Sequence, residues 1–339
     1  MRASTGFVAF CLSAFVATSS CENKERADVR AKPLIDHHAH ILSPHLIDDW
    51  KKVGAQFSKP DASYGALPSG AGAVSSFGNF RIKTGGAVSM AHIYGAEWFR
   101  GALKYDQADE LSRVQRENDF AAQAAGDAPF FCSAPFARPY TSEEALRCAE
   151  TLEAYGLKIH LGAAEADFKD PAQLSALSEL FALAVRFDMT VLLHLDPQRR
   201  GTDVEDVAEL LNKAVGPHPN LRLVIAHFGG SGGYGPWPRS VFTAINDWLQ
   251  QEEEAGRPRP GIYFDISAVL MAEETEGVSA TSPEEIEHLK ADLRRFGFER
   301  ILFASDYPVF DPLGYAGLLA DQLALTNSEA DFLIGNHIK

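Results

Sequence analysis

Four histidines and one aspartate stand at or near the ends of apolar segments, where they could share a single site. His38 and His40 are two residues apart, so on an extended backbone both imidazoles leave the same face. Two neighbouring imidazoles supply half of a tetrahedral or five-coordinate metal site. His194, His227 and Asp306 follow later in the chain. A single histidine in such a position is usually a hydrogen-bonded structural residue, but the full set predicts a metal-dependent site.

Eight short apolar or β-branched segments carry these residues, and helix-like segments separate them. Buried parallel strands have this length and composition. Eight such strands alternating with helices predict the α/β class and a (β/α)8 TIM-type barrel, whose active sites form at the C-terminal ends of the strands. An open doubly wound sheet is the alternative, but no glycine-rich phosphate loop follows the first segment. The segments are Pro33–His38, Ala87–Tyr94, Pro129–Ala134, Leu157–Leu161, Thr190–Leu195, Leu221–His227, Gly261–Ser267 and Ile301–Asp306.

Two of the predicted helices have clear start signals. Asp170-Pro171 and Ser282-Pro283 each combine an N-cap residue with a proline in the first turn. After each start, apolar residues recur at helical spacing and share one face. These residues are Leu174, Leu177, Phe181 and Ala184 in the first helix, and Ile286, Leu289, Leu293 and Phe296 in the second.

The composition is that of a globular chain with a large core, because 46% of the 339 residues are hydrophobic. A prior of roughly 150 residues per domain suggests two domains, but one α/β barrel can be this long. The net charge of −15 argues against a nucleic-acid partner. The region Lys51–Gly86, rich in Gly, Ser and Ala, is predicted to leave the barrel after its first strand and to lie partly over its mouth.

The N-terminus has the pattern of an export signal. The apolar run Phe7–Ala17 is too short to cross a bilayer and is typical of the apolar region of a secretory signal. The small residues before Cys21 resemble a bacterial lipoprotein signal, in which this cysteine is lipidated; the alternative is an ordinary signal cut near Ser20. We therefore predict a signal peptide over 1–20, a tether over 21–32 and a barrel domain over 33–339. The expected location is periplasmic or, with a lipid anchor, on the membrane.

Cysteine is sparse in this chain. Four cysteines are too few for a disulfide scaffold at this size. Cys132 lies on a predicted strand and is expected to be a buried apolar residue, although export would permit a bridge to Cys148.

The order of the motifs resembles one enzyme family. His38-Ala39-His40, His194, His227 and Ser305-Asp306-Tyr307-Pro308, in this order, are similar to the amidohydrolase superfamily. The closer likeness is to its amidohydrolase-related branch, which includes metal-dependent hydrolases of lactones and non-oxidative decarboxylases of the aminocarboxymuconate semialdehyde decarboxylase type. The resemblance covers the whole predicted barrel domain. It implies a (β/α)8 barrel, a catalytic His227 that faces the metal-bound water or the substrate, and metal ligands at His38, His40, His194 and Asp306.

These ligands suit a divalent metal, and one zinc ion is the expected cofactor. Zinc held by neutral imidazoles lowers the pKa of its water to about 7, which makes hydroxide available at neutral pH. Asp306 would both ligate the ion and take the water proton, as a second catalytic residue. His227 would act as a second base or polarise a substrate carbonyl. Manganese or iron would fit similar N/O ligands.

The fourth predicted strand leaves the number of metals open. Lys158 and His160 are two apart and share one side of the strand. In some amidohydrolases a carboxylated lysine at the end of this strand bridges two metals. Here the lysine precedes the expected strand end, so we predict one metal, with His160 in contact with substrate and Lys158 packed deeper; a bridging Lys158 is the alternative.

Other residues are weaker candidates for the site. Arg138 could bind a substrate carboxylate through its guanidinium, or it could be a solvated loop arginine. His37 has the opposite parity to His38 and is expected to point towards the helices. The run Gly229–Gly235 is predicted to form a mobile flap to which Tyr234 and Trp237 add apolar surface. Further pocket candidates are His92, Asp265 and Ser267.

The predicted function is metal-dependent hydrolysis of a small ester, lactone or amide bond by an activated water. One alternative is a non-oxidative, metal-dependent decarboxylase of a small aromatic or enolic acid. Another is an exported lipoprotein that binds a ligand without catalysis. The partner in each case is a small molecule. Neither the individual substrate nor a homo-oligomeric state is specified by these patterns.

Overall fold

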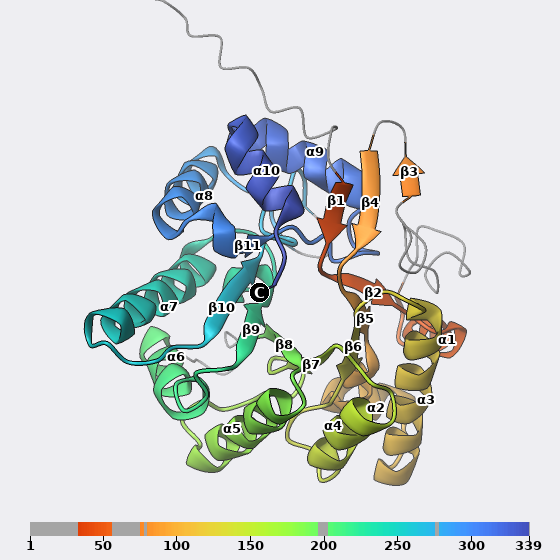
Figure 1. Ribbon diagram of the computed structural model, residues 1–339. Helices are drawn as coiled ribbons and strands as arrows, with labels where there is room; N and C mark the ends of the chain where they lie inside the picture. The colour runs from red at the N-terminus through yellow and green to blue at the C-terminus, as the bar shows by residue number, and fades with distance from the viewer. Residues whose placement is uncertain (1–32, 56–74, 78–79, 196–202, 275–277, 339) are drawn as a thin grey trace, which may run out of the picture.

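Seven of the eight predicted strand segments, together with Ala39–Ile41, form a parallel sheet that curls into a barrel (Figure 1). The computed structural model describes residues 33–55, 75–77, 80–195, 203–274 and 278–338; the predicted signal peptide over 1–20 and the predicted tether over 21–32, which includes Cys21, lie outside them. Within these ranges, all neighbouring strands of the eight-stranded sheet pair in parallel. In sheet order, the strands are β2 (Ala39–Ile41), β5 (Ala87–Ser89), β6 (Phe130–Ser133), β7 (Gly156–His160), β8 (Thr190–His194), β9 (Arg222–Ile225), β10 (Gly261–Asp265) and β11 (Ile301–Leu302).

The first and last strands of this sheet meet through backbone contacts. Ala39 forms a parallel bridge with Tyr307. Nearby, the His40 amide donates to the carbonyl of Tyr307 at 2.7 Å, and the Asp306 amide donates to the carbonyl of His38 at 2.8 Å. The predicted (β/α)8 TIM-type barrel is therefore confirmed.

The start of the first barrel strand was predicted wrongly. Strand β1 (Pro33–Asp36) belongs to a separate three-stranded sheet. It pairs with β4 (Phe80–Thr84), and β4 also pairs with β3 (Ser75–Phe77). The barrel strand β2 begins only at Ala39. The registers Asp36–Thr84 and Ala39–Ala87 belong to one ladder that is interrupted between them. In the Lys51–Gly86 region, residues 75–77 and 80–86 therefore extend from the N-terminal end of the barrel, not over its mouth, while residues 56–74 and 78–79 lie outside the described chain.

Glycine allows the interruption between the two sheets. The amides of Gly85 and Gly86 both donate to the carbonyl of Asp36. A Cβ on Gly86 would lie 2.0 Å from the carbonyl oxygen of His37, a separation that no side chain tolerates. The close approach of these two chain segments therefore needs glycine at this position.

Helices surround the barrel and cover its outer face (Figure 1). The predicted starts are confirmed: the Asp170 side chain accepts from the Ala172 amide, and Ser282 forms a capping box with Glu285. No helix in the described part of the chain is long and apolar enough to cross a membrane. The α-helices are α1 (Pro44–Lys52), α2 (Glu97–Leu103), α3 (Gln107–Ala125), α4 (Thr141–Glu150), α5 (Pro171–Arg186), α6 (Val204–Leu210), α7 (Pro236–Glu254), α8 (Pro283–Phe296), α9 (Pro312–Leu323) and α10 (Asn327–Gly335).

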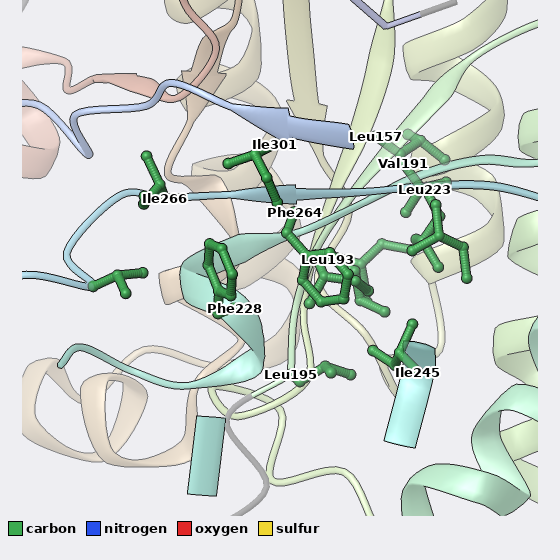
Figure 2. Close-up of a cluster of buried hydrophobic side chains, with 14 of the residues drawn as sticks. Leu157, Val191, Leu193, Leu195, Leu223, Phe228, Ile245, Phe264, Ile266 and Ile301 are labelled. Carbon is green, nitrogen blue, oxygen red and sulfur yellow. The ribbon is translucent and has the colours of Figure 1, made fainter. Parts of the chain in front are cut away.

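The core has two layers because side chains alternate along each strand. Val191 and Leu193 of β8 belong to the layer between the strands and the helices, where Ile245 of α7 also packs (Figure 2). Leu192, between them in sequence, belongs to the cluster inside the barrel. This inner cluster consists of Val88, Phe131, Leu192, Val224, Ala226, Tyr263 and Leu302.

The C-terminal segment lies against the inside of the barrel. Ile338 packs on the inner cluster, and the C-terminus lies over the centre of the barrel in Figure 1. The Asn336 side chain donates to the carbonyls of Phe298 and Ile301 at 2.6 and 2.9 Å. The Asn336 carbonyl lies 2.9 Å from Nε2 of His37. The segment therefore fills the N-terminal end of the barrel, and His37 faces it rather than the opposite end.

A disulfide joins Cys132 of β6 to Cys148 of α4. Both residues are fully buried. Cys132 is therefore buried as expected, and the bridge that export would permit is present. It joins a barrel strand to a helix that covers the sheet.

Candidate functional site

The C-terminal ends of the strands bring the predicted site residues together. His40 lies in β2, and His160 and His194 end the neighbouring strands β7 and β8, where they are direct register partners. His227 lies in the 3₁₀ turn (Ala226–Gly229) after β9. Asp306 follows β11. Because parallel strands all end on the same side of a barrel, residues far apart in sequence become neighbours here.

Three of these side chains converge within metal-binding distance. One possible ligand atom from each of His38, His40 and Asp306 lies within 4.8 Å of the other two. The two Nε2 atoms are 3.1 Å apart, and Oδ1 of Asp306 lies 3.1 Å from Nε2 of His40. This Oδ1 atom and Nδ1 of His40 are buried without a hydrogen-bond partner. Converging imidazoles with an unsatisfied carboxylate oxygen suit a divalent cation, which would satisfy these atoms together.

Asp265 orients His38. Its Oδ2 atom lies 2.9 Å from Nδ1 of His38, and its Oδ1 atom accepts from the amides of His227 and Ser267. Burial alone would raise the pKa of Asp265, but His38 and the hydrogen bonds from His38 and Ser267 hold the pKa below its usual value. An ionised Asp265 requires a proton on Nδ1 of His38. The Nε2 lone pair is therefore directed at the metal-binding group.

Asp306 is kept ionised by its neighbours. Burial raises the pKa of this carboxyl, but the neighbouring imidazoles of His227, His40 and His38 outweigh burial and hold the pKa well below its usual value. An ionised carboxylate can bind a cation and accept a proton.

The hydrogen bonds of His227 leave one ring nitrogen unprotonated. Its Nδ1 atom lies 3.1 Å from the carbonyl oxygen of Ser267 and 2.8 Å from the hydroxyl oxygen of the same residue. That hydroxyl donates its own proton to Asp265, so both oxygens accept from Nδ1. The proton of the neutral ring therefore stays on Nδ1, and Nε2 can accept a proton.

The backbone is strained where these loops begin. His227, Phe228, Ala268 and Asp306 have φ angles of 51°, 52°, 52° and 55°, in the left-handed region that favours glycine. Each such residue costs of order 1–3 kcal/mol, and they cluster after β9, β10 and β11. Strain of this kind concentrates at functional sites, which agrees with the convergence of side chains here.

His194 lies beside the three-residue group but outside it. Its ring stacks on that of His160 with centroids 3.8 Å apart, and lies 4.8 Å from the ring of His227. Its Nε2 atom is buried without a hydrogen-bond partner. The predicted role of His194 as a fourth ligand is thus compatible with its unsatisfied nitrogen, and it stays a prediction.

Lys158 reaches the same group from a deeper level of the barrel. It pairs in register with Leu192, while its Nζ atom lies 3.2 Å from Nε2 of His38. Burial lowers the pKa of Lys158 to about 8, although Asp306 and Asp265 oppose this shift. The amine of Lys158 therefore contacts His38, a candidate metal ligand, from a deeper level of the barrel.

A model of the amidohydrolase family matches residues 35–331 of the sequence. The chain belongs to this family. No curated protein matches it in sequence. Its motif order, its barrel and its histidine–aspartate group agree with the membership that the sequence predicted.

Solved structures with the same fold are distant in sequence. One is 2,6-dihydroxybenzoate decarboxylase from Rhizobium, with a TM-score of 0.51, 15% identity and coverage of 90% of this chain and 96% of that one. Another is an amidohydrolase from Burkholderia multivorans with bound zinc, with a TM-score of 0.51, 19% identity and coverage of 90% and 96%. A third is dihydroxybenzoic acid decarboxylase from Polaromonas sp. JS666 with manganese and the inhibitor 2-nitroresorcinol, with a TM-score of 0.50, 13% identity and coverage of 90% and 95%. At these identities, the likeness shows the barrel fold alone.

Arg138 of this amidohydrolase is engaged elsewhere. Its Nε and Nη2 atoms donate to the two carboxylate oxygens of Glu110 at 2.6 and 2.7 Å, and the Tyr140 hydroxyl donates to the same carboxylate. Glu110 is fully buried, so this bidentate pair satisfies a charge inside the protein. The geometry does not support the predicted contact between Arg138 and a substrate carboxylate.

The predicted flap is anchored in this amidohydrolase. Tyr234 is buried, and its hydroxyl donates to Asp292 of α8 at 3.0 Å. Trp237 is partly buried and packs on the main core. The prediction that these two rings supply apolar surface to a mobile flap is therefore wrong.

One residue of the site was not found from the sequence. Ser133, at the end of β6, contacts His92 with its hydroxyl. Nothing in its spacing distinguishes it from other small strand residues. His92, by contrast, is a histidine just after a strand, which is the signal that made it a pocket candidate.

Proposed function

We propose that this amidohydrolase is a metal-dependent hydrolase of a small ester, lactone or amide. The proposal rests on the ionised Asp306 carboxylate, which lies 3.1 Å from Nε2 of His40 with an unpartnered oxygen. Hydrolysis needs a base beside the attacking water and a route for its proton to the leaving group. The ionised carboxylate of Asp306 lies beside the histidines that would hold the metal, where it could accept the proton of an attacking water.

His38, His40, His194 and Asp306 would hold one divalent ion, with zinc proposed and manganese or iron as alternatives. Such an ion would polarise a carbonyl and lower the pKa of water to about 7. Asp306 would take the proton of the attacking water and pass it to the leaving group. His227 would accept a hydrogen bond or a second proton at Nε2, because Nδ1 is committed to Ser267.

We propose one metal rather than two. Lys158 starts two residues below the strand end, and its amine contacts a ligand nitrogen instead of projecting past it. Elemental analysis of the wild type and of Lys158→Ala tests this choice. One equivalent of metal in the wild type is expected, and two equivalents that fall on substitution would assign the bridging role to Lys158.

A second candidate function is non-oxidative decarboxylation. The likeness to 2,6-dihydroxybenzoate and dihydroxybenzoic acid decarboxylases favours it. The protein loaded with zinc or manganese should be offered lactones, esters and amides in one panel and hydroxybenzoates and enolic acids in another. Incorporation of ¹⁸O from labelled water into the product acid supports hydrolysis. Carbon dioxide release without acyl cleavage overturns it, and a metal-loaded protein inactive on both panels would favour the ligand-binding lipoprotein.

We further propose that residues 1–20 are a signal peptide, that 21–32 are a tether and that Cys21 is lipidated, with the barrel domain over 33–339 on the exported side. The disulfide between Cys132 and Cys148 supports export, because such bonds persist in oxidising compartments. Fractionation of Cys21→Ser tests lipidation. Loss of membrane association with export retained is expected, and unchanged fractionation would contradict it.

A further inference from the structure

One buried carboxylate next to the metal-binding group has no part in the proposed chemistry. Asp36 is the last residue of β1, and its side chain is buried. Its Oδ1 atom accepts from the amides of His38 and Ser305 at 3.2 and 3.0 Å, and its Oδ2 atom accepts from the Ser305 hydroxyl at 2.6 Å. Asp36 therefore connects the segment that carries His38 with the segment that carries Asp306.

The hydroxyl of Ser305 continues this connection around Asp306. Its oxygen accepts from the amide of Tyr307 at 3.1 Å, while its proton goes to Asp36. Asp306 lies between these two residues and has a φ of 55°, in the left-handed region. A serine hydroxyl that bonds the backbone two residues ahead restrains a turn of this kind. The strained backbone of Asp306 is thus held by a hydroxyl that Asp36 orients.

The two segments meet where the barrel closes. The amide of Asp306 donates to the His38 carbonyl at 2.8 Å, and the amide of His40 donates to the Tyr307 carbonyl at 2.7 Å. We call the contact between these four residues the seam. In the described chain, strand β11 ends before the seam, which has one isolated bridge between Ala39 and Tyr307. The side-chain bonds described above therefore add to a short backbone contact.

The seam determines the distance between two candidate metal ligands. Nε2 of His38 lies 3.5 Å from Oδ1 of Asp306. Metal ligands must lie within about 0.2 Å of their ideal distance, so a small shift between the two segments would separate this carboxylate from an ion held by the histidines. Among the hydrogen bonds of Asp36 in the described chain, none goes to an imidazole. Asp36 can therefore influence the ligands only through the seam.

We propose that Asp36 and Ser305 are positioning residues, which hold the carboxylate of Asp306 beside His38 so that the site is already formed when the divalent ion binds. The inference deepens the proposed function and rests on it, since it assumes that His38 and Asp306 bind the metal. In this scheme, neither positioning residue touches the ion, the water or the substrate. A preformed site binds more tightly, because its ligands are already ordered by folding.

Hydrogen exchange of the metal-free protein tests the seam itself. Asp36→Asn replaces one acceptor oxygen by an N–H donor, and Ser305→Ala removes the hydroxyl that this oxygen binds. Both substitutions should raise the exchange rates of the His40 and Asp306 amides about tenfold or more, because a hydrogen bond to a carboxylate is lost. The amides of β8, across the barrel, should keep their rates. Ser305→Ala is the milder change and keeps the test decisive if Asp36→Asn unfolds.

Cobalt(II) binding tests the link from the seam to the ion, because the visible absorption of bound cobalt reports its ligands. Asp36→Asn and Ser305→Ala should each weaken cobalt binding about 10- to 100-fold and change the visible bands. The double substitution should be no weaker than the weaker single variant, since both break the same bond. Asp49→Asn is the matched control: Asp49 is also buried, but it contacts Arg113 and Tyr94, so cobalt affinity and spectrum should stay at wild-type values.

Unchanged exchange of the His40 and Asp306 amides in both single variants, or wild-type cobalt binding in both, would overturn the positioning role. So would a double substitution whose free-energy loss is the sum of the two single losses. None of these readouts needs turnover. Cobalt binding that depends on Asp36, with no hydrolysis of any acyl substrate, would therefore contradict hydrolysis alone, whereas hydrolysis with a kcat unaffected by Ser305→Ala would contradict the positioning role alone.

Discussion

Asp265 connects the residues proposed to bind metal with the residue proposed as a base. One of its oxygens contacts His38, and the other accepts from His227 and Ser267. The same carboxylate therefore sets the orientation of His38 and the position of the strained turn that carries His227. Asp265 itself would neither bind the metal nor transfer a proton. The proposed metal binding by His38 and the proposed proton transfer by His227 would nevertheless both depend on its position.

We expect Asp265→Asn to weaken zinc binding about 10- to 100-fold, because the amide no longer compels Nδ1 of His38 to hold its proton. Competition with a chromogenic chelator would measure the zinc affinity. Asp292→Asn is the matched control, since Asp292 contacts Tyr234 and Arg239 instead of the histidines. Equal zinc affinities for Asp265→Asn and the wild type would contradict this account of His38.

At the level of elements, the broken ladder between β1–β4 and β2–β5 decides where His38 points. The pairs β1–β4 and β2–β5 have the same register, so they are two parts of one ladder that is interrupted between them. His37 and His38 lie in the break, and they face opposite ends of the barrel: one contacts Asn336 and the other Asp265.

We expect Gly86→Ala to lower the free energy of unfolding by about 3 kcal/mol or more, because its Cβ would lie 2.0 Å from the His37 carbonyl and the two segments would have to separate. Denaturant unfolding measures the loss, and zinc affinity should fall with it. Gly101→Ala in α2 has no atom within 4 Å of the new Cβ and should be neutral or stabilising by up to about 1 kcal/mol. Similar effects of the two substitutions would refute the steric explanation.

The contact between α1 and α3 should depend on pH. Glu117 of α3 contacts the amide and hydroxyl of Ser43, the N-cap of α1. Burial raises the pKa of Glu117 from 4.5 to about 7, although the bonds from Ser43 oppose this. Because the folded state prefers the protonated acid, the resulting stabilisation is complete below pH 4.5 and is lost as the pH rises through about 7.

We therefore expect the difference in unfolding free energy between wild type and Glu117→Gln to change by about 3 kcal/mol between pH 4.5 and 7, in favour of the glutamine variant as the pH rises. Above that window the difference should level off. Urea unfolding of both proteins at several pH values would measure it. A difference that does not vary across the window would show that Glu117 titrates normally.

At the scale of the whole molecule, the barrel could be predicted from the sequence. Its strands are short, buried apolar segments, and two of its helices have local start signals. Asp170 and Ser282 cap helices as their neighbours predict. The break at His37 was not predictable from the apolar pattern, since it depends on the approach of Gly86 from another segment. The ion pair of Arg138 was not predictable, because its partner Glu110 lies 28 residues away and only the fold brings them together. The converging group at His38, His40 and Asp306 was predictable from strand ends, but the links through Asp265 and Ser133 were not.

The C-terminal segment should contribute to the stability of the whole barrel. Asn336 donates to two backbone carbonyls, of Phe298 and Ile301. We expect Asn336→Ala to lower the free energy of unfolding by about 1–3 kcal/mol, because both carbonyls lose a partner. The exposed Asn327→Ala should change it by less than about 0.5 kcal/mol. Thermal and denaturant unfolding would compare them, and equal effects would show that the Asn336 contacts are dispensable.

The packing of Ile338 inside the barrel also determines the side from which a small molecule can reach the histidines. With one end filled by the chain itself, anything that reaches the histidines arrives from the C-terminal side of the strands. As far as the described part of the chain goes, a product would leave on the same side, so it would compete with the reactant for the space beside the histidines. Product should therefore act as a competitive inhibitor, and a turnover cannot begin until the previous product has left.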